Sequence, residues 1–296
     1  MDASRKRACT SGKDRLTALP DALIHTIMSF LKAHQVVQTC VLAKRWRHLW
    51  RSVPFLDIDL PEFNSKVSDE AAIKARYQKF VDFVDYLLFH RHQDGALLDT
   101  FRLHTNAAHT PIPEDAGRWV RRGLWCSPRV LHIHHSFGRY GRTVACIPWE
   151  LVSGPSGFCR LSKLHLVGLF LKCSFVEQVI SVYHTLEELE LKNCQILFQK
   201  IESLSLKSLI IDGCGTPYVK NLIITAPHLA SVHLDLKPYG YDFVVFELNE
   251  MLSLTKASIH NRSSYQGDLV HDNQFKLLSS LSNVTSLELL GFHRRV

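Results

Sequence analysis

The chain has 296 residues, of which 46% are apolar, so it has room for about two domains and can bury a large core. Its net charge of +7 is spread over a sequence with only 21% charged residues, which is too dilute to predict nucleic-acid binding by itself. Its apolar stretches, such as residues 166–171, are far shorter than the roughly 20 residues of a membrane helix, so we expect no membrane association.

Residues 1–14 are predicted to be a disordered basic tail. The cluster Arg5-Lys6-Arg7 within them is either a nuclear import signal or a solvated run of the kind common at chain ends. No apolar segment follows these basic residues, so a secretory signal is not expected. We therefore expect the protein in the nucleus, the cytoplasm or both. The eight cysteines form no C-x-x-C motif, and we expect them to be small buried residues.

Residues 15–60 are predicted to form three short helices. Pro20 followed by Asp21 is typical of a helix N-terminus, because proline lacks only an N–H that would have no partner there. Apolar residues then recur at helical spacing in three groups. These groups are Leu23, Ile24, Ile27, Met28 and Leu31, then Val36, Val37, Cys40 and Val41, then Trp46, Leu49 and Trp50. A unit of this size cannot enclose all these side chains. We therefore expect a partner to cover some of them.

The pairs Leu19-Pro20 and Val41-Leu42 and the run KRWRHLW at residues 44–50 resemble the F-box motif. The resemblance implies that the segment docks on a Skp-type adaptor, and through it on the cullin and RING subunits of an SCF-type ubiquitin ligase. The implied adaptor-binding residues are Leu19, Pro20, Leu23, Ile27, Leu31, Val41, Leu42, Trp46, Leu49 and Trp50.

Two positions depart from what is common in the family. These are Gln35 and Ala43, and neither is an apolar anchor. Without the resemblance, the segment would be interpreted as a helical hairpin packed on the rest of the chain, with Trp46 and Trp50 in the core. Residues 61–97 follow as a predicted helical connector, with its helix running to about His90.

Residues 98–296 contain eight copies of the template L-x-x-L-x-L. Their fourth positions are residues 101, 131, 164, 189, 209, 232, 257 and 287, at the irregular spacing of leucine-rich repeats. Each copy predicts a short strand whose apolar side chains enter a shared core. Helical spacing at residues 114–124 and 175–184 predicts helices on the convex side. The expected fold is α/β: a three-helix F-box followed by a leucine-rich-repeat solenoid of about eight irregular repeats.

This order of segments resembles plant F-box/LRR proteins. Relatives of the FBD-associated kind carry a further C-terminal FBD domain, and we expect that domain to be absent here because the sequence ends soon after the eighth template.

The residue between the last two apolar positions of each template should point to the concave face, because strand side chains alternate. We predict that these residues bind the target protein; the alternative for any one of them is a merely solvated position. They are Arg102, His132, His165, Glu190, Ile210, His233, Ser258 and Glu288. Arg102, His132 and His165 favour an acidic partner, because a histidine with a reference pKa of ~6.5 can gain charge.

No motif for enzyme chemistry or cofactor binding is found, so we expect neither catalytic residues nor a cofactor. His132, His134 and His135 are the best metal candidates, but no acidic or thiol ligand is fixed nearby, and we expect no metal. The predicted function is that of a non-catalytic substrate-recognition subunit of a ubiquitin ligase. Two alternatives remain: a repeat scaffold without a ubiquitin-ligase role, and a basic nucleic-acid-binding protein, although nucleic acid is not the expected partner.

Overall fold

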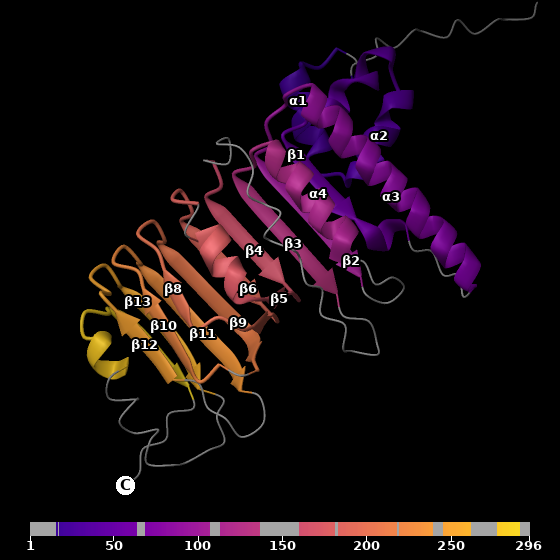
Figure 1. Ribbon diagram of the computed structural model, residues 1–296. Helices are drawn as coiled ribbons and strands as arrows, with labels where there is room; N and C mark the ends of the chain where they lie inside the picture. Colours follow the sequence, from indigo (N-terminus) through magenta and orange to yellow (C-terminus); the bar gives the residue numbers. More distant parts are fainter. Residues whose placement is uncertain are drawn as a thin grey trace, which may run out of the picture.

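The computed structural model of the chain describes residue 16 and residues 18–63, 69–106, 113–136, 160–180, 183–217, 219–238, 245–261 and 277–290. The predicted tail, residues 1–14, lies outside these ranges. Helices gather at the N-terminal end, and a long parallel sheet extends away from them (Figure 1). No helix in the described ranges is long and apolar enough to cross a membrane.

Two α-helices and three 3-10 turns make up the N-terminal unit. They are α1 (Asp21–Met28), α2 (Ala33–Gln38), η1 (Thr39–Val41), η2 (Lys44–Arg47) and η3 (Leu49–Arg51). The start of α1 after Pro20 agrees with the prediction. The expected third helix is instead the pair of turns η2 and η3, which hold the buried residues Trp46 and Trp50. Tertiary packing of the two indoles therefore decides this segment, and helical spacing alone does not.

A strand that the sequence pattern does not predict follows these turns. It is β1 (Phe55–Asp59), with Leu56 and Ile58 buried on one side. It pairs in parallel with β2 (Thr100–Asn106). The N-terminal unit therefore continues directly into the sheet.

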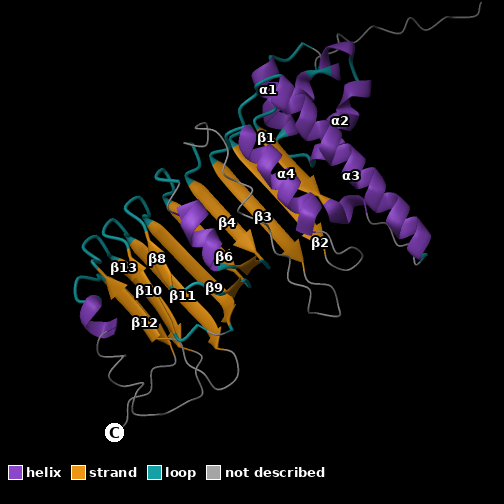
Figure 2. Ribbon diagram, in the orientation of Figure 1, coloured by secondary structure: helices purple, strands orange, loops and turns teal. Residues whose placement is uncertain are grey.

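Two longer helices lie side by side at the N-terminal end of the sheet (Figure 2). After the turn η4 (Leu60–Phe63), helix α3 (Glu70–Gln93) runs a few residues beyond the expected end, and α4 (Pro113–Trp125) follows β2. The carboxylate of Asp69 caps α3 by accepting a hydrogen bond of 3.2 Å from the Ala72 N–H.

All eight templates form strands of one parallel sheet. After β2 these are β3 (Val130–Ser136), β4 (Lys163–Val167), β6 (Glu188–Lys192), β9 (Ser208–Thr216), β11 (Ser231–Pro238), β13 (Lys256–Asn261) and β14 (Ser286–Leu290). They lie in this order after β1, and the short strands β5 (Phe170–Leu171) and β7 (Gln195–Ile196) pair beside them. The register aligns the fourth template positions throughout, from Phe101 opposite Leu131 to Ala257 opposite Leu287. The predicted strands and their alignment are confirmed.

The opposite side of the core differs from the prediction. Helix α4 confirms the expected helix at residues 114–124, but at residues 175–184 the described part holds only α5 (Cys173–Phe175) and a π-helical turn, η6 (Val176–Ile180). A second parallel sheet of three strands follows: β8 (Lys200–Glu202), β10 (Asn221–Thr225) and β12 (Val245–Asn249). The connections between the strands from β6 to β13 are short. An extended strand spans a given distance with about half the residues of a helix, so short connections favour strands on this side of the core.

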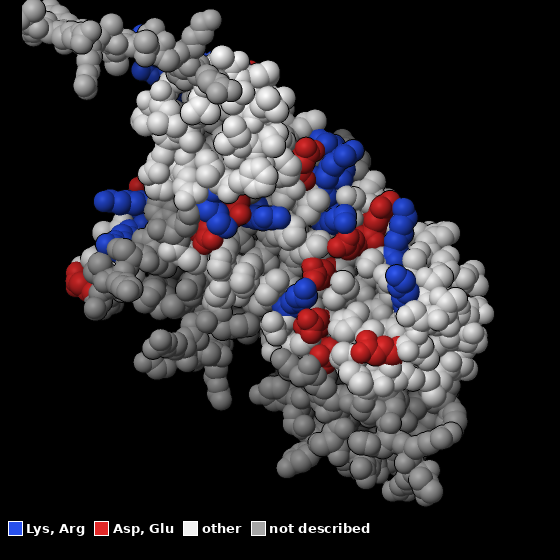
Figure 3. Space-filling view, turned by 180° about the vertical axis from the view of Figure 1, so that it is seen from behind, with Lys and Arg blue, Asp and Glu red and all other residues white. Residues whose placement is uncertain are grey.

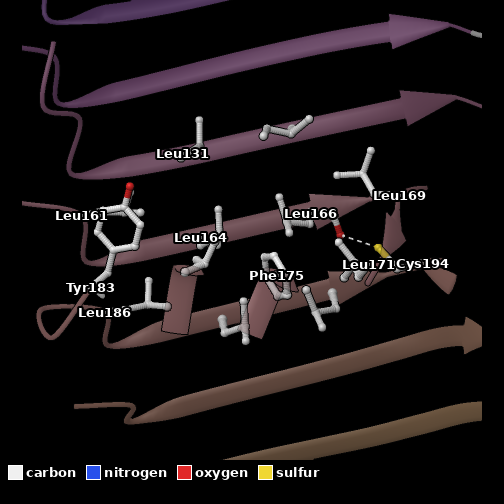
Figure 4. Packing of buried hydrophobic residues seen from close by; sticks show 14 of the residues in the cluster. Leu131, Leu161, Leu164, Leu166, Leu169, Leu171, Phe175, Tyr183, Leu186 and Cys194 are labelled. Atoms are coloured by element: carbon white, nitrogen blue, oxygen red, sulfur yellow. Dashed lines mark hydrogen bonds between the residues drawn. The ribbon is translucent and has the colours of Figure 1, made fainter. Parts of the chain in front are cut away.

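Leucines from successive strands fill the core between the two layers. Figure 4 shows Leu131, Leu164 and Leu166 packed with Phe175 from α5. Two buried cysteines close this core at the end of their strands: Cys194 Sγ lies 3.4 Å from the carbonyl oxygen of Leu166, and Cys214 Sγ lies 3.3 Å from that of Leu191. The expectation of buried cysteines is confirmed for these two and for Cys126, whereas Cys40 is only partly buried and the expectation is wrong for Cys173, which is exposed.

Candidate functional site

Several large apolar side chains of the N-terminal unit are exposed. Leu23 and Ile27, one turn apart on α1, are 51% and 45% exposed, and Phe30, Val41 and Leu42 are between 67% and 84% exposed. We call these five residues the N-terminal apolar patch. Large apolar side chains that remain exposed in such number on one small unit are typical of a site that binds another protein.

The tryptophans predicted to belong to the adaptor-binding set lie in the core. Trp46 and Trp50 are 5% and 6% exposed. The indole of Trp50 contacts the rings of Tyr86 and His90 on α3, with centroids 6.4 Å apart in both cases. The two tryptophans can therefore support a binding surface but contribute little of it.

The other four members of the set differ in exposure. Pro20 is exposed, whereas Leu19, Leu31 and Leu49 are partly buried against the core. Phe30 is a patch residue that the sequence prediction omits. Its position three residues after Ile27, on the same helical side, is the signal that identifies it.

The eight predicted target-binding residues stand in one row across the main sheet. Strand pairing places them side by side in the order Arg102, His132, His165, Glu190, Ile210, His233, Ser258 and Glu288. The row continues onto β1, where Asp57 is opposite Arg102. Helices α4 and α5 lie on the other face of the sheet (Figure 1). We call the face that carries the row the open face; its charged side chains are seen in Figure 3.

Histidine rings form two pairs at the N-terminal end of this face. The rings of His104 and His134 are stacked with centroids 4.2 Å apart, and those of His132 and His165 lie at the same distance with tilted planes. His104 and His134 belong to a second row, two residues further along their strands, which the prediction omits. The alternation of side chains along a strand is the signal that identifies this second row.

The charge of these histidines differs from the expectation. Burial, together with the nearby His165 and Arg102, lowers the pKa of His132 to about 4. Burial and His104 also lower the pKa of His134. His132 is therefore neutral near pH 7, and the expectation that it supplies positive charge for an acidic partner is wrong.

Two other basic side chains of the first strands face carboxylates of the chain itself. His165 Nδ1 pairs with the carboxylate of Glu190, and its Nε2 lies 3.2 Å from Glu188. Burial raises the pKa of Glu190, but hydrogen bonds from Lys192 and His165 outweigh it and lower the pKa overall. The Arg102 guanidinium lies 4.0 Å from Asp57. This end of the open face thus has little uncompensated positive charge.

The C-terminal end of the row is connected by hydrogen bonds. His233 Nδ1 lies 3.0 Å from the hydroxyl of Ser258, which donates a hydrogen bond of 2.8 Å to Glu288. The ring of His260, from the second row, meets that of His233 edge to face. Within the described ranges, no group of three or more His, Cys, Asp or Glu side chains could hold a metal ion.

Residues 16–58 match the family model of the F-box domain. The N-terminal unit is therefore an F-box domain. The match covers the whole N-terminal unit and most of β1, and it confirms the resemblance carried by Leu19-Pro20 and residues 44–50.

Plant proteins are similar to almost the whole chain. The rice protein named MEIOTIC F-BOX protein MOF is 31% identical over 297 residues, which cover 95% of this chain and 60% of that protein. An F-box/FBD/LRR-repeat protein of Arabidopsis thaliana is 27% identical, covering 94% of this chain and 66% of the relative. An F-box/LRR-repeat protein of the same plant is 26% identical, covering 93% and 63%. The chain thus spans about three fifths to two thirds of the length of these relatives, and no solved structure matches it.

Proposed function

We propose that this F-box protein is the substrate-recognition subunit of an SCF-type E3 ubiquitin ligase. In this proposal the F-box docks on a Skp-type adaptor, which connects it to cullin and RING subunits. The main sheet is the strand layer of a leucine-rich-repeat solenoid of about eight repeats that binds a target protein. The subunit itself catalyses nothing and holds the target near a ubiquitin-conjugating enzyme supplied by its partners.

The observation that carries the proposal is the exposure of the N-terminal apolar patch. Burying one large apolar side chain contributes roughly 1.5–3 kcal/mol. The five residues of the N-terminal apolar patch are all exposed and can therefore supply a substantial part of the binding free energy of an interface. The buried Trp46 and Trp50 hold the turns that present Val41 and Leu42.

Two further features support the proposal. The names of the plant relatives include both an F-box and leucine-rich repeats, and the strands of the main sheet repeat at the spacing of such repeats. We propose that the row from Arg102 to Glu288 on the open face contacts the target. We also propose that the protein works in the nucleus, the cytoplasm or both.

The test places charges in the N-terminal apolar patch. The double variant Ile27→Asp, Val41→Asp is co-expressed with a Skp-type adaptor, and adaptor that co-purifies is measured. We expect loss of the adaptor, because a carboxylate cannot be buried in an apolar interface without a large cost. The matched control is Leu252→Asp, an apolar residue that is 77% exposed on the turn before β13.

The control should retain the adaptor, and circular dichroism should show that both variants are folded. Adaptor binding by the folded double variant at the wild-type level would contradict the proposal. That result would favour the scaffold without a ubiquitin-ligase role.

A further inference from the structure

The row on the open face contains one aliphatic residue, Ile210 on β9. Its side chain is partly buried, and strand pairing places it between Glu190 on β6 and His233 on β11. Two residues further along β9, Asp212 points to the same face. An aliphatic surface and a carboxylate therefore lie next to each other at the middle of the sheet.

The strands around Ile210 present more acidic than basic side chains. Asp212 stands opposite Lys192 on one side and Asp235 on the other. Lys192 is engaged, because its ammonium pairs with the carboxylate of Glu190. Asp235 is 98% buried, and its carboxylate lies 3.8 Å from Nδ1 of His260. Within the described residues, Asp212 forms no close ion pair, and its carboxylate attracts Lys192 only at longer range.

We propose that a basic segment of the target docks here, with an arginine or lysine side chain lying along Ile210 and its cationic head on Asp212. The inference rests on the proposed function, and it names the chemistry of the target. Arginine and lysine bury their methylene stems on apolar surface while the charged head remains at a polar site. A guanidinium can in addition form two parallel hydrogen bonds with one carboxylate.

The charge pattern of the open face supports a basic partner. Figure 3 shows acidic side chains continuing along this face toward the C-terminal strands, with Lys and Arg side chains between and beside them. At the other end, His132 is neutral and Arg102 and His165 face carboxylates of the chain, so an acidic partner finds little free positive charge. The net charge of +7 of the whole chain repels a basic ligand at long range. Binding of such a ligand therefore requires a local acidic site.

The experiment measures peptide binding to the full chain, purified with its adaptor. The probe is a fluorescein-labelled Gly/Ser peptide carrying several arginines, and a second peptide carries glutamates at the same positions. Fluorescence anisotropy should show binding of the arginine peptide only. Asp212→Asn, which keeps the shape of the side chain, should raise its Kd by about fivefold or more. Ile210→Ser should also weaken binding, although it leaves the charge unchanged.

The matched control is Glu202→Gln, which removes an exposed carboxylate from β8 of the three-stranded sheet, outside the open face. It should bind the arginine peptide like the wild type. Absence of binding, equal binding of the glutamate peptide, or an unchanged Kd in both Asp212→Asn and Ile210→Ser would overturn the inference. Adaptor co-purification of the same variants separates the two hypotheses: if the adaptor is retained and the peptide result is negative, only the docking site fails.

Discussion

The guanidinium of Arg91 donates a hydrogen bond of 2.6 Å to the main-chain carbonyl of Val53. A second bond of 3.0 Å goes to the carbonyl of Trp50. The side chain is fully buried, and burial lowers the pKa of Arg91 to about 10, so it remains protonated near pH 7. Through these two bonds, helix α3 is linked to η3 and to the residues that lead into β1.

Replacing Arg91 should therefore loosen this junction. We expect Arg91→Met to lower the free energy of unfolding by about 2–4 kcal/mol, because two buried carbonyls lose a charged donor. Urea unfolding followed by circular dichroism measures the change. Arg129→Met removes an exposed arginine and should have almost no effect. Equal stability of both variants would show that water replaces the Arg91 donors.

The depressed pKa of His132 predicts a dependence of stability on pH. The folded state binds this proton at about pH 4 and the unfolded state near 6.5, so between these values the unfolded state holds more protons. The contribution of neutral His132 is present above pH 6.5 and is lost as the pH falls toward 4. We expect the wild type to lose about 1–2 kcal/mol more than His132→Gln between pH 7 and pH 4.5, after allowance for partial exposure.

Urea unfolding at the two pH values tests this difference. Titration of the His132 imidazole by NMR gives an independent value for its pKa. A midpoint near 6.5 would mean that the ring is solvated and that its contact with His165 does not persist in solution.

Gly123 on α4 is a position where helix propensity and packing make opposite predictions. A Cβ at this residue would lie 2.1 Å from Cε1 of Phe101 on β2. Propensity alone predicts that Gly123→Ala stabilises the helix by about 1 kcal/mol. We expect the reverse, a loss of about 1–3 kcal/mol, because the buried ring of Phe101 must shift. The thermal unfolding midpoint measures the sign, and Phe101→Leu in the same chain should recover part of the loss.

Asp85 connects α3 to α4 through a shared carboxylate. It accepts hydrogen bonds from the Trp119 indole at 2.9 Å, from Arg122 at 2.8 Å and from Arg118 at 3.0 Å. We expect Asp85→Ala to cost about 1–3 kcal/mol, because these donors lose a charged acceptor. Asp82→Ala, on the exposed side of the same helix, is the control and should cost much less. Similar losses in the two variants would mean that only helix propensity is affected.

The residue pattern alone predicts the strands of the main sheet and their alignment. A period of two residues gives each strand one apolar side, so residues such as Leu164 and Leu189 can only enter the core when the strands align as observed. It also determined the F-box, because Leu19-Pro20 and residues 44–50 place large residues at set spacings.

Which apolar residues remain exposed and which ionisable groups carry charge depends on contacts between segments that are distant in the sequence. Nothing in local spacing separates Trp46, which is buried, from Val41, which is exposed, because the difference depends on contacts with distant segments. Likewise, His132 loses its charge through burial beside His165, a residue 33 positions away that strand pairing places next to it. The burial and the charge of a residue depend on such spatial neighbours, whereas the pattern along the chain shows only the type and the spacing of each residue.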